Sequence, residues 1–271
     1  MAQKTIIHLS DLHIGQRTKE TIYLARIADT IKADYPGARV VITGDLTNAS
    51  SKKQFEKVRE CLEDLPPENP VLMVPGNHDC AFGPFGSCYS PEARNNYLEC
   101  FGLPSEWVGS GVTWQDEGVD GLDVWTEDSV VYCGLDSCMP KNWWNLIITN
   151  GFISEQLADN LKATLDGHST KTRVVFLHHH PFSQVPHFVA LDGEEKLLAA
   201  LENRCELLLF GHRHHQETWV RKSGVNFSSA SRKSTDKIDG TLLLPTITIT
   251  DPGDPAVSFG FSEVPVSAPV K

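Results

Sequence analysis

The first third of the chain alternates short apolar runs with amphipathic stretches. The runs at Thr5–Leu9, Arg39–Thr43 and Val71–Val74 are rich in β-branched residues, which favours buried strands. Between them, apolar residues recur at helical spacing, which predicts helices over about residues 19–32 and 52–62. A strand–helix–strand–helix–strand order is typical of βαβ units, so we predict a largely parallel sheet.

The rest of the chain shows the same two kinds of pattern. In chain order, we predict a helix that begins at Ser90–Pro91, strands at about Leu122–Thr126 and Val130–Gly134, a helix near Ser154–Leu165, a strand at Arg173–Leu177, a helix near Gly193–Glu202 and a strand at Glu206–Phe210. From Trp219 onward the pattern is strand-rich, with strands predicted at Thr241–Thr250 and Val257–Glu263 around a strong turn signal. We therefore predict an α/β fold with a second, more antiparallel sheet near the C-terminus.

Composition and charge narrow the class of protein. The 271 residues contain no Pro/Gly/Ser-rich linker and no internal repeat, so we expect one domain over residues 1–271. No apolar run approaches the length of a membrane span, so we expect no membrane partner. The formal net charge of -11 argues against a protein that coats nucleic acid through basic patches. Bound metal ions could supply local positive charge, so a nucleic-acid substrate is less favoured but is not excluded.

The cysteines bear on the cellular compartment. All seven are scattered, and none forms a Cys-x-x-Cys pair. An odd number without such a pair argues against a disulfide framework and fits a reducing compartment. The chain also begins with a predicted strand rather than a signal peptide. We therefore expect a cytoplasmic protein with free thiols.

Metal-ligand residues follow five of the predicted strands directly. They are Asp11, His13, Asp45, Asn77, His178, His212 and His214. In open α/β sheets, ligand sites form in the crevice beyond the carboxyl ends of the strands, so these side chains should converge. Asp11 and His13 are separated by one residue, and so are His212 and His214. Because side chains alternate along a strand, both members of each pair should lie on one side.

The number of donors indicates two metal ions rather than one. Seven residues exceed the needs of a tetrahedral ion, and a central carboxylate such as Asp45 can bridge two ions through its two oxygens. Ion pairs of this kind, about 3.5–4 Å apart, clamp the attacking and leaving oxygens of an in-line displacement at phosphorus. The pattern therefore predicts a dinuclear centre for phosphoester chemistry.

The complete set of motifs resembles the signature of the calcineurin-like metallophosphoesterases. The matching segments are Asp11-x-His13, Gly44-Asp45, Gly76-Asn77-His78-Asp79, His178 and Gly211-His212-Arg213-His214, which span roughly residues 5–250. The resemblance implies a four-layer αββα sandwich of two mixed β-sheets flanked by helices. It also implies two divalent metal ions, of manganese, iron or zinc, bridged by Asp45 and a hydroxide that attacks phosphorus.

The resemblance also distributes the ligands. Asp11, His13, Asp45 and His214 would hold one ion, and Asp45, Asn77, His178 and His212 the other. His78 matches the family's non-ligand histidine, and we expect Asp79 to orient its ring, so both are catalytic candidates. His178 directly follows its strand and is the favoured ligand of the triplet His178-His179-His180, although a register with His179 on the metal stays open.

The substrate is the least determined feature of the sequence. Gly134-Leu135-Asp136-Ser137 and the stretch from Leu191 towards Gly211 are similar to the class III cyclic nucleotide phosphodiesterases, so we expect cyclic nucleotides or similar small phosphodiesters. A nuclease, a nucleotide-pyrophosphate hydrolase and a non-catalytic scaffold are the alternatives. Residues 80–121 and the paired Trp143 and Trp144 depart from that branch, and the tryptophans either stack on a base or form a buried pair.

Overall fold

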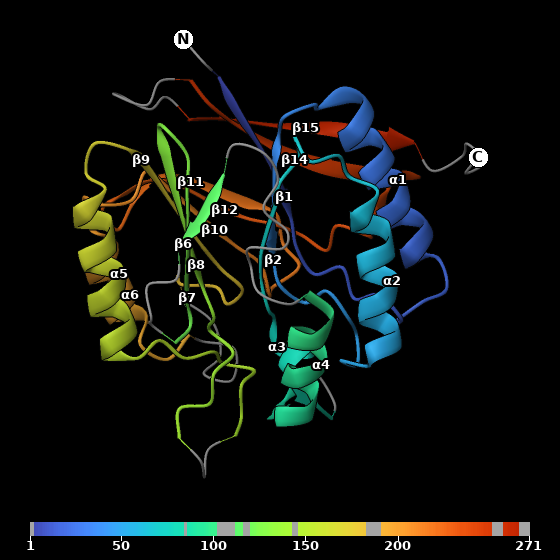
Figure 1. Cartoon of the computed structure of the whole chain (residues 1–271), viewed down its shortest axis with the longest axis horizontal. Coiled ribbons are helices and arrows are strands. Elements are labelled where there is room, and N and C mark those ends of the chain that lie inside the picture. Colours follow the sequence, from blue (N-terminus) through green and yellow to red (C-terminus); the bar gives the residue numbers. More distant parts are fainter. Residues whose placement is uncertain are drawn as a thin grey trace.

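The computed structural model describes residues 3–83, 86–101, 112–115, 120–142, 146–182, 191–250 and 257–265. Two mixed sheets lie face to face between two layers of helices (Figure 1). Helices α1 (Glu20–Asp34) and α2 (Lys52–Glu63) pack on the outer face of one sheet. Helices α5 (Glu155–Gly167) and α6 (Glu194–Leu201) pack on the outer face of the other. The predicted four-layer αββα sandwich is confirmed.

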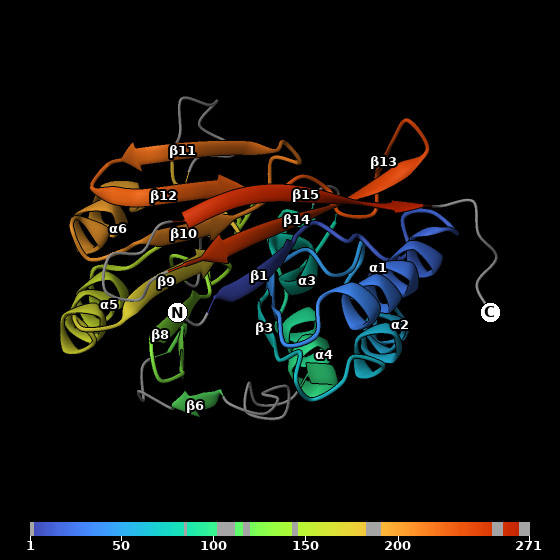
Figure 2. The ribbon, with the colours of Figure 1, turned by 90° about the horizontal axis from the view of Figure 1, so that it is seen from above.

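The first sheet combines the beginning and the end of the chain. Its parallel strands are β1 (Lys4–Leu9), β2 (Arg39–Thr43) and β3 (Val71–Val74). Its antiparallel strands are β13 (Lys237–Ile238), β14 (Thr241–Ile249) and β15 (Val257–Pro265). Strand β14 pairs directly with β1, and Figure 2 shows β14 and β15 lying beside β1.

The C-terminal strands therefore do not form the separate sheet that the sequence suggests. The reason is that β14 is apolar on both faces. Leu242 and Leu244 pack into the helix-side core, whereas Ile247 and Ile249 pack between the two sheets. A strand with two buried faces is stable only where both faces are covered, and the position beside β1 covers both.

The second sheet is built from the middle of the chain. Its order is β11 (Glu217–Lys222), β12 (Val225–Ala230), β10 (Leu207–Phe210), β9 (Thr172–Leu177), β8 (Val130–Leu135), β7 (Leu122–Thr126) and β6 (Thr113–Gln115). The four central strands, from β12 to β8, are parallel, and the outer ones are antiparallel. Three of the predicted ligands thus follow strands of this sheet, and four follow strands of the other.

The two sheets are joined by an apolar layer and, at the amino ends of the strands, by a buried ion pair. Trp125 stacks on Phe176 within the layer, with ring centroids 5.6 Å apart. The Glu127 side chain is 1% exposed and accepts hydrogen bonds from Arg39 at 2.5 and 2.8 Å and from Lys4 at 2.6 Å. Glu127 lies between β7 and β8, so this contact links the second sheet to β1 and β2.

A small set of elements covers the carboxyl ends of the strands. Helix α3 (Asn77–Cys80) leads into β4 (Ala81–Phe82), which pairs with β5 (Cys88–Tyr89), and α4 (Pro91–Phe101) follows. Helix α4 begins as the sequence predicts. Trp143 and Trp144 lie outside the described residues, so both interpretations of that pair stay predictions. Among the helices that the structure describes, none is long and apolar enough to cross a membrane.

Candidate metal centre

The predicted ligands stand in tight turns that follow the strands. Asp11, His13, Asp45, His212 and His214 all adopt left-handed backbone conformations, with φ between 46° and 71°. Non-glycine residues rarely adopt this conformation, which costs energy and clusters at functional sites. Half of the ten described non-glycine residues with positive φ are thus predicted metal ligands at the facing carboxyl ends of the two sheets, which is consistent with a functional role for these turns.

The expected reason for the convergence of Asp11 and His13 is wrong. Strand alternation does not place Asp11 beside His13, because β1 ends at Leu9 and both residues lie in the following turn. The turn is held to its neighbour by two backbone hydrogen bonds, from Asp11 N to the Gly44 carbonyl at 3.0 Å and from His13 N to the Asp45 carbonyl at 2.9 Å. The pair converges as expected, but through this paired-turn geometry.

One donor group, called here the first donor group, consists of Asp11, His13, Asp45 and His214. One ligand atom from each residue lies within 4.8 Å of the others. His13 Nε2 lies 3.0 Å from His214 Nε2 and 3.5 Å from Asp45 Oδ2, and His214 Nε2 lies 3.2 Å from Asp11 Oδ1. Donors that share a tetrahedral ion at 2.0–2.2 Å are about 3.3 Å apart, so this spacing suits a metal ion.

A second donor group lies on the other side of Asp45 and consists of Asp45, Asn77, His178 and His212. His178 Nε2 is central: it lies 3.1 Å from Asn77 Oδ1, 3.2 Å from His212 Nδ1 and 3.5 Å from Asp45 Oδ1. Asp45 therefore turns Oδ2 towards the first donor group and Oδ1 towards the second. This is the arrangement that a bridging carboxylate requires.

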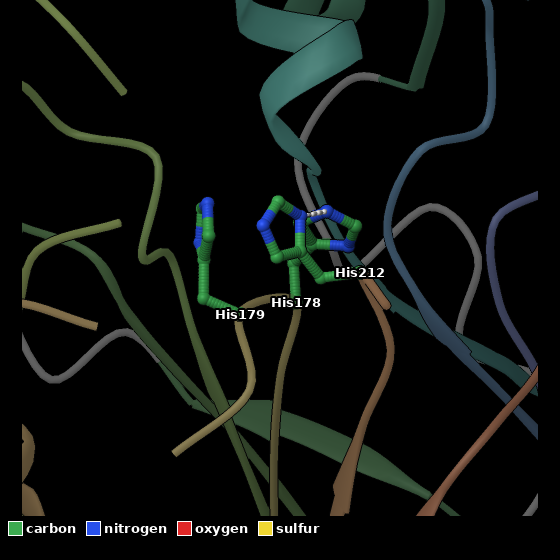
Figure 3. A group of neighbouring side chains, drawn as sticks. All are labelled: His178, His179 and His212. Carbon is green, nitrogen blue, oxygen red and sulfur yellow. Dashed lines mark hydrogen bonds between the residues drawn. The ribbon is translucent and has the colours of Figure 1, made fainter. Parts of the chain in front are cut away.

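The contacts of the histidine triplet favour His178 over His179 as the ligand. Figure 3 shows the His178 ring turned towards His212. His179 lies close to both, with one ligand atom of each of the three residues within 4.8 Å of the others, so proximity alone does not separate the two candidates. Both His179 nitrogens are engaged: Nδ1 lies 2.7 Å from Ser137 Oγ, and Nε2 lies 3.1 Å from the Ile148 carbonyl. His178 Nδ1 lies 2.8 Å from the Thr43 carbonyl, which fixes the ring so that Nε2 faces the donors.

Buried polar atoms show that the two groups suit metal ions. Asp11, Asp45, Asn77 and His178 are each at most 2% exposed, and their polar atoms face other ligand atoms rather than water. Buried polar atoms normally have partners, and an unpaired one is costly. Carboxylate, amide and imidazole donors together suit borderline divalent ions such as zinc, manganese and iron. The donor chemistry and the geometry thus agree with the dinuclear centre that the sequence predicts.

The environment favours the metal-binding protonation states of His13, His212 and Asp11, whereas at His214 the hydrogen bond and charge of Asp11 outweigh burial and raise the pKa. Burial lowers the pKa of His13 to about 4 and that of His212 to about 3, which keeps both rings neutral. Burial alone would raise the pKa of Asp11, but the hydrogen bond and charge of His214 outweigh it and hold this pKa below its ordinary value. Neutral imidazoles and ionised carboxylates are the ligand forms.

The Asp79 carboxylate joins two of the three ligand-bearing turns of the first sheet, those that follow β2 and β3. Its Oδ2 accepts hydrogen bonds from Leu46 N at 3.0 Å and Gly76 N at 2.9 Å. Its Oδ1 accepts from Thr47 N at 2.9 Å and from the Thr47 hydroxyl at 3.0 Å. Burial and the charge of Asp45 raise the pKa of Asp79 to about 6, against the lowering effect of the backbone donors. Asp79 therefore acts by holding the turns in place.

The expectation that Asp79 orients the His78 ring is thus wrong. The contact at His78 Nδ1 is instead the Asn48 carbonyl, at 3.0 Å. The backbone nitrogen of His78 donates to Asp45 Oδ1 at 2.9 Å, so the residue is fixed directly to the bridging carboxylate. No sequence signal identified Asn48, because a backbone carbonyl has no residue-type signature. The catalytic role of His78 stays a prediction.

Gly76 allows the two turns to approach closely. A Cβ atom at this position would overlap the backbone nitrogen and the carboxylate of Asp45. We expect Gly76→Ala to displace Asp45 and to remove most bound metal, measured by elemental analysis of the purified protein. Gly167→Ala is the matched control, because a Cβ atom there meets nothing within 4 Å. Unchanged metal content in Gly76→Ala would show that the turns do not need this contact.

Comparisons with known proteins agree with this geometry. A family model described as calcineurin-like phosphoesterase matches residues 4–216. No curated protein matches the chain significantly in sequence.

Solved structures share the fold at low identity. A dimetal phosphatase from Danio rerio is 12% identical, with a TM-score of 0.68, and the match covers 97% of this chain and 99% of that one. The purple acid phosphatase PPD1 from yellow lupin is 12% identical, with a TM-score of 0.61, and 95% of this chain matches 51% of it. GAP50 from Plasmodium, an inner-membrane-complex anchor, is 14% identical, with a TM-score of 0.61 and coverages of 99% and 87%. The extent of the family match shows that the chain belongs to the calcineurin-like phosphoesterase family.

Proposed function

We propose that this protein is a dinuclear metal-dependent phosphodiesterase that acts on cyclic nucleotides or similar small phosphodiesters. The observation that carries the proposal is the position of Asp45 between two complete donor groups, with one carboxylate oxygen facing each. When bound, two divalent ions supply Lewis-acid activation of water and of the phosphoryl group. Manganese, iron and zinc are the candidate ions.

The chain's own residues would position the substrate and assist the leaving group. The His78 ring lies edge-on to His13, with centroids 4.8 Å apart, so it borders the first donor group. Since Nδ1 contacts the Asn48 carbonyl, Nε2 is the ring atom that can meet a phosphoryl or leaving-group oxygen. The Asp45 contact to the His78 backbone keeps this ring at a fixed place beside the phosphorus position.

The alternatives differ in what supports them. A nuclease needs affinity for a polyanionic backbone, which the net charge of -11 disfavours. A nucleotide-pyrophosphate hydrolase would use the same metals and differ only in the substrate. The Plasmodium neighbour is named an anchor, so a scaffold is one alternative, but a scaffold has no need of two sets of ligand atoms at these short distances. The cytoplasmic location expected from the cysteines stays a proposal.

A substrate panel tests the proposal. Purified protein with added Mn²⁺ would be assayed on cyclic nucleotides, linear aryl diesters, monoesters, nucleotide pyrophosphates and single-stranded DNA. We expect the highest kcat/KM on small diesters. A preference for DNA or pyrophosphates would move the assignment to one of the alternatives. Failure to hydrolyse any member of the panel with two ions bound would favour the scaffold.

Replacing His78 should separate metal binding from turnover. We expect His78→Ala to keep both ions but to lower kcat by about 10²–10⁴-fold, the usual contribution of a positioned acid or base. Elemental analysis and diester kinetics would be measured on the same preparation. His215→Ala is the control, because His215 is an exposed histidine next to a ligand in sequence. Wild-type turnover in His78→Ala would remove His78 from the mechanism.

A further inference from the structure

A short segment beyond the family match packs against the first donor group. This segment, residues 231–236, follows β12 and is called here the strap. Ser234 N donates to the Ser10 carbonyl at 3.0 Å, and Ser10 N donates to the Ser234 hydroxyl at 3.0 Å. The Thr235 hydroxyl donates to the Leu12 carbonyl at 2.9 Å. The strap therefore contacts the residues on both sides of Asp11 directly.

Lys233 extends these contacts to the turn after His13. Its side chain is 4% exposed, and its ammonium group hydrogen-bonds to Gln16 and lies 3.6 Å from Glu20 Oε1. Glu20 is equally buried, and its Oε2 accepts from Gly15 N at 3.1 Å and Arg17 N at 2.8 Å. One buried ion pair thus connects the strap to the backbone that follows a metal ligand.

The burial of this pair indicates a positional role. A buried ion pair is weak support for stability in itself, because desolvation offsets much of the attraction. It does fix geometry, because each partner must stay where the other can neutralise it. Here the Lys233 ammonium is the cation beside Glu20 Oε1, at an ion-pair distance of 3.6 Å without a hydrogen bond, and Glu20 Oε2 holds two backbone amides. Loss of Lys233 would leave Glu20 buried without its cation and free the turn to shift.

We infer that the strap positions the first donor group for its metal ion, with Lys233 and Glu20 as positioning residues. The inference rests on the proposed function, in that this group is taken to bind a metal. It assigns a role to a part of the chain that the family match, residues 4–216, does not include. Neither residue touches the substrate in this role. Their effect reaches the metal through the backbone of residues 10–17.

Titration of metal-free protein with Mn²⁺, followed by calorimetry, tests the inference. The wild type should show two classes of site, and His214→Ala identifies the class that belongs to the first donor group. We expect Lys233→Met to weaken that same class by about 10-fold or more, as for other residues that orient metal ligands, and to leave the other class within about twofold. Lys196→Met is the matched control, since Lys196 forms an exposed ion pair with Glu155 at 3.4 Å on the opposite helical layer.

The possible outcomes distinguish the inference from the proposed function. Fewer than two Mn²⁺ sites in the wild type would contradict the dinuclear proposal itself. Two wild-type sites with both affinities retained in Lys233→Met would overturn only the role of the strap, even if the metal-free variant unfolds at a lower temperature. If Lys233→Met does not fold, Thr235→Val removes a single hydroxyl contact to Leu12. It should weaken the same class of site, and unchanged binding there would overturn the inference equally.

Discussion

Asp45→Asn is expected to remove nearly all diesterase activity, by at least about 10³-fold, which corresponds to about 4 kcal/mol of transition-state stabilisation. Asparagine keeps the shape of the side chain but has one carbonyl oxygen and no charge. It can therefore serve only one of the two donor groups that Asp45 now faces with separate oxygens. Elemental analysis should show that at least one ion is lost, alongside the loss of turnover.

The control for this variant is another aspartate changed in the same way. Asp192 forms an exposed ion pair with Lys141 at 2.6 Å and lies outside both donor groups, so Asp192→Asn should keep metal and activity. Circular dichroism would confirm that both variants are folded. Two bound ions and normal turnover in Asp45→Asn would show that the carboxylate does not bridge, and the dinuclear arrangement would have to be abandoned.

Glu127→Gln is expected to lower the free energy of unfolding by about 3 kcal/mol, measured by urea denaturation. The substitution keeps the shape but removes the charge of a side chain that is 1% exposed and neutralises two partly buried cations, Arg39 and Lys4. Glu127 lies at the amino ends of the strands, whereas the donor groups lie at the carboxyl ends. The folded variant should therefore turn over substrate at the wild-type rate.

An exposed glutamate provides the comparison for Glu127. Glu155 is 78% exposed in its ion pair with Lys196, so Glu155→Gln should change the unfolding free energy by less than about 1 kcal/mol. Similar effects at both positions would mean that water reaches Glu127 and screens its ion pairs. A loss of turnover in folded Glu127→Gln would mean that the two ends of the sheets are coupled.

The local elements of this fold can be predicted from the sequence, and the sheet order cannot. Strands β2 and β3 have the predicted bounds because glycine or proline follows each apolar run directly, at Gly44 and Pro75. The pairing of β14 with β1 joins residues such as Lys4 and Ile249, which no short-range pattern connects. Alternation along β14 shows that both faces are apolar, but it does not say which strand lies beside it.

The same is true of the site: the types of residue that form it can be predicted from the sequence, but many of their contacts cannot. The ligand candidates could be predicted because carboxylate, amide and imidazole groups at strand ends are chemically distinctive. The contacts of Asp79 could not, since its position next to His78 in sequence suggested a pairing that the α3 turn does not make. Lys233 is a lysine in a polar stretch, and only the packing of the strap shows that it is buried.

The division of the donors between the two sheets has a mechanical consequence. Asp11, Asp45 and Asn77 are attached to one half of the sandwich, and His178 and His212 to the other. An ion bound by residues of both halves would cross-link the two sheets along the face on which they pack together. Sliding or splaying of one half against the other must then break coordination bonds as well as apolar contacts. The availability of metal ions would thus determine how rigidly the two sheets are held together, as well as whether the site is active.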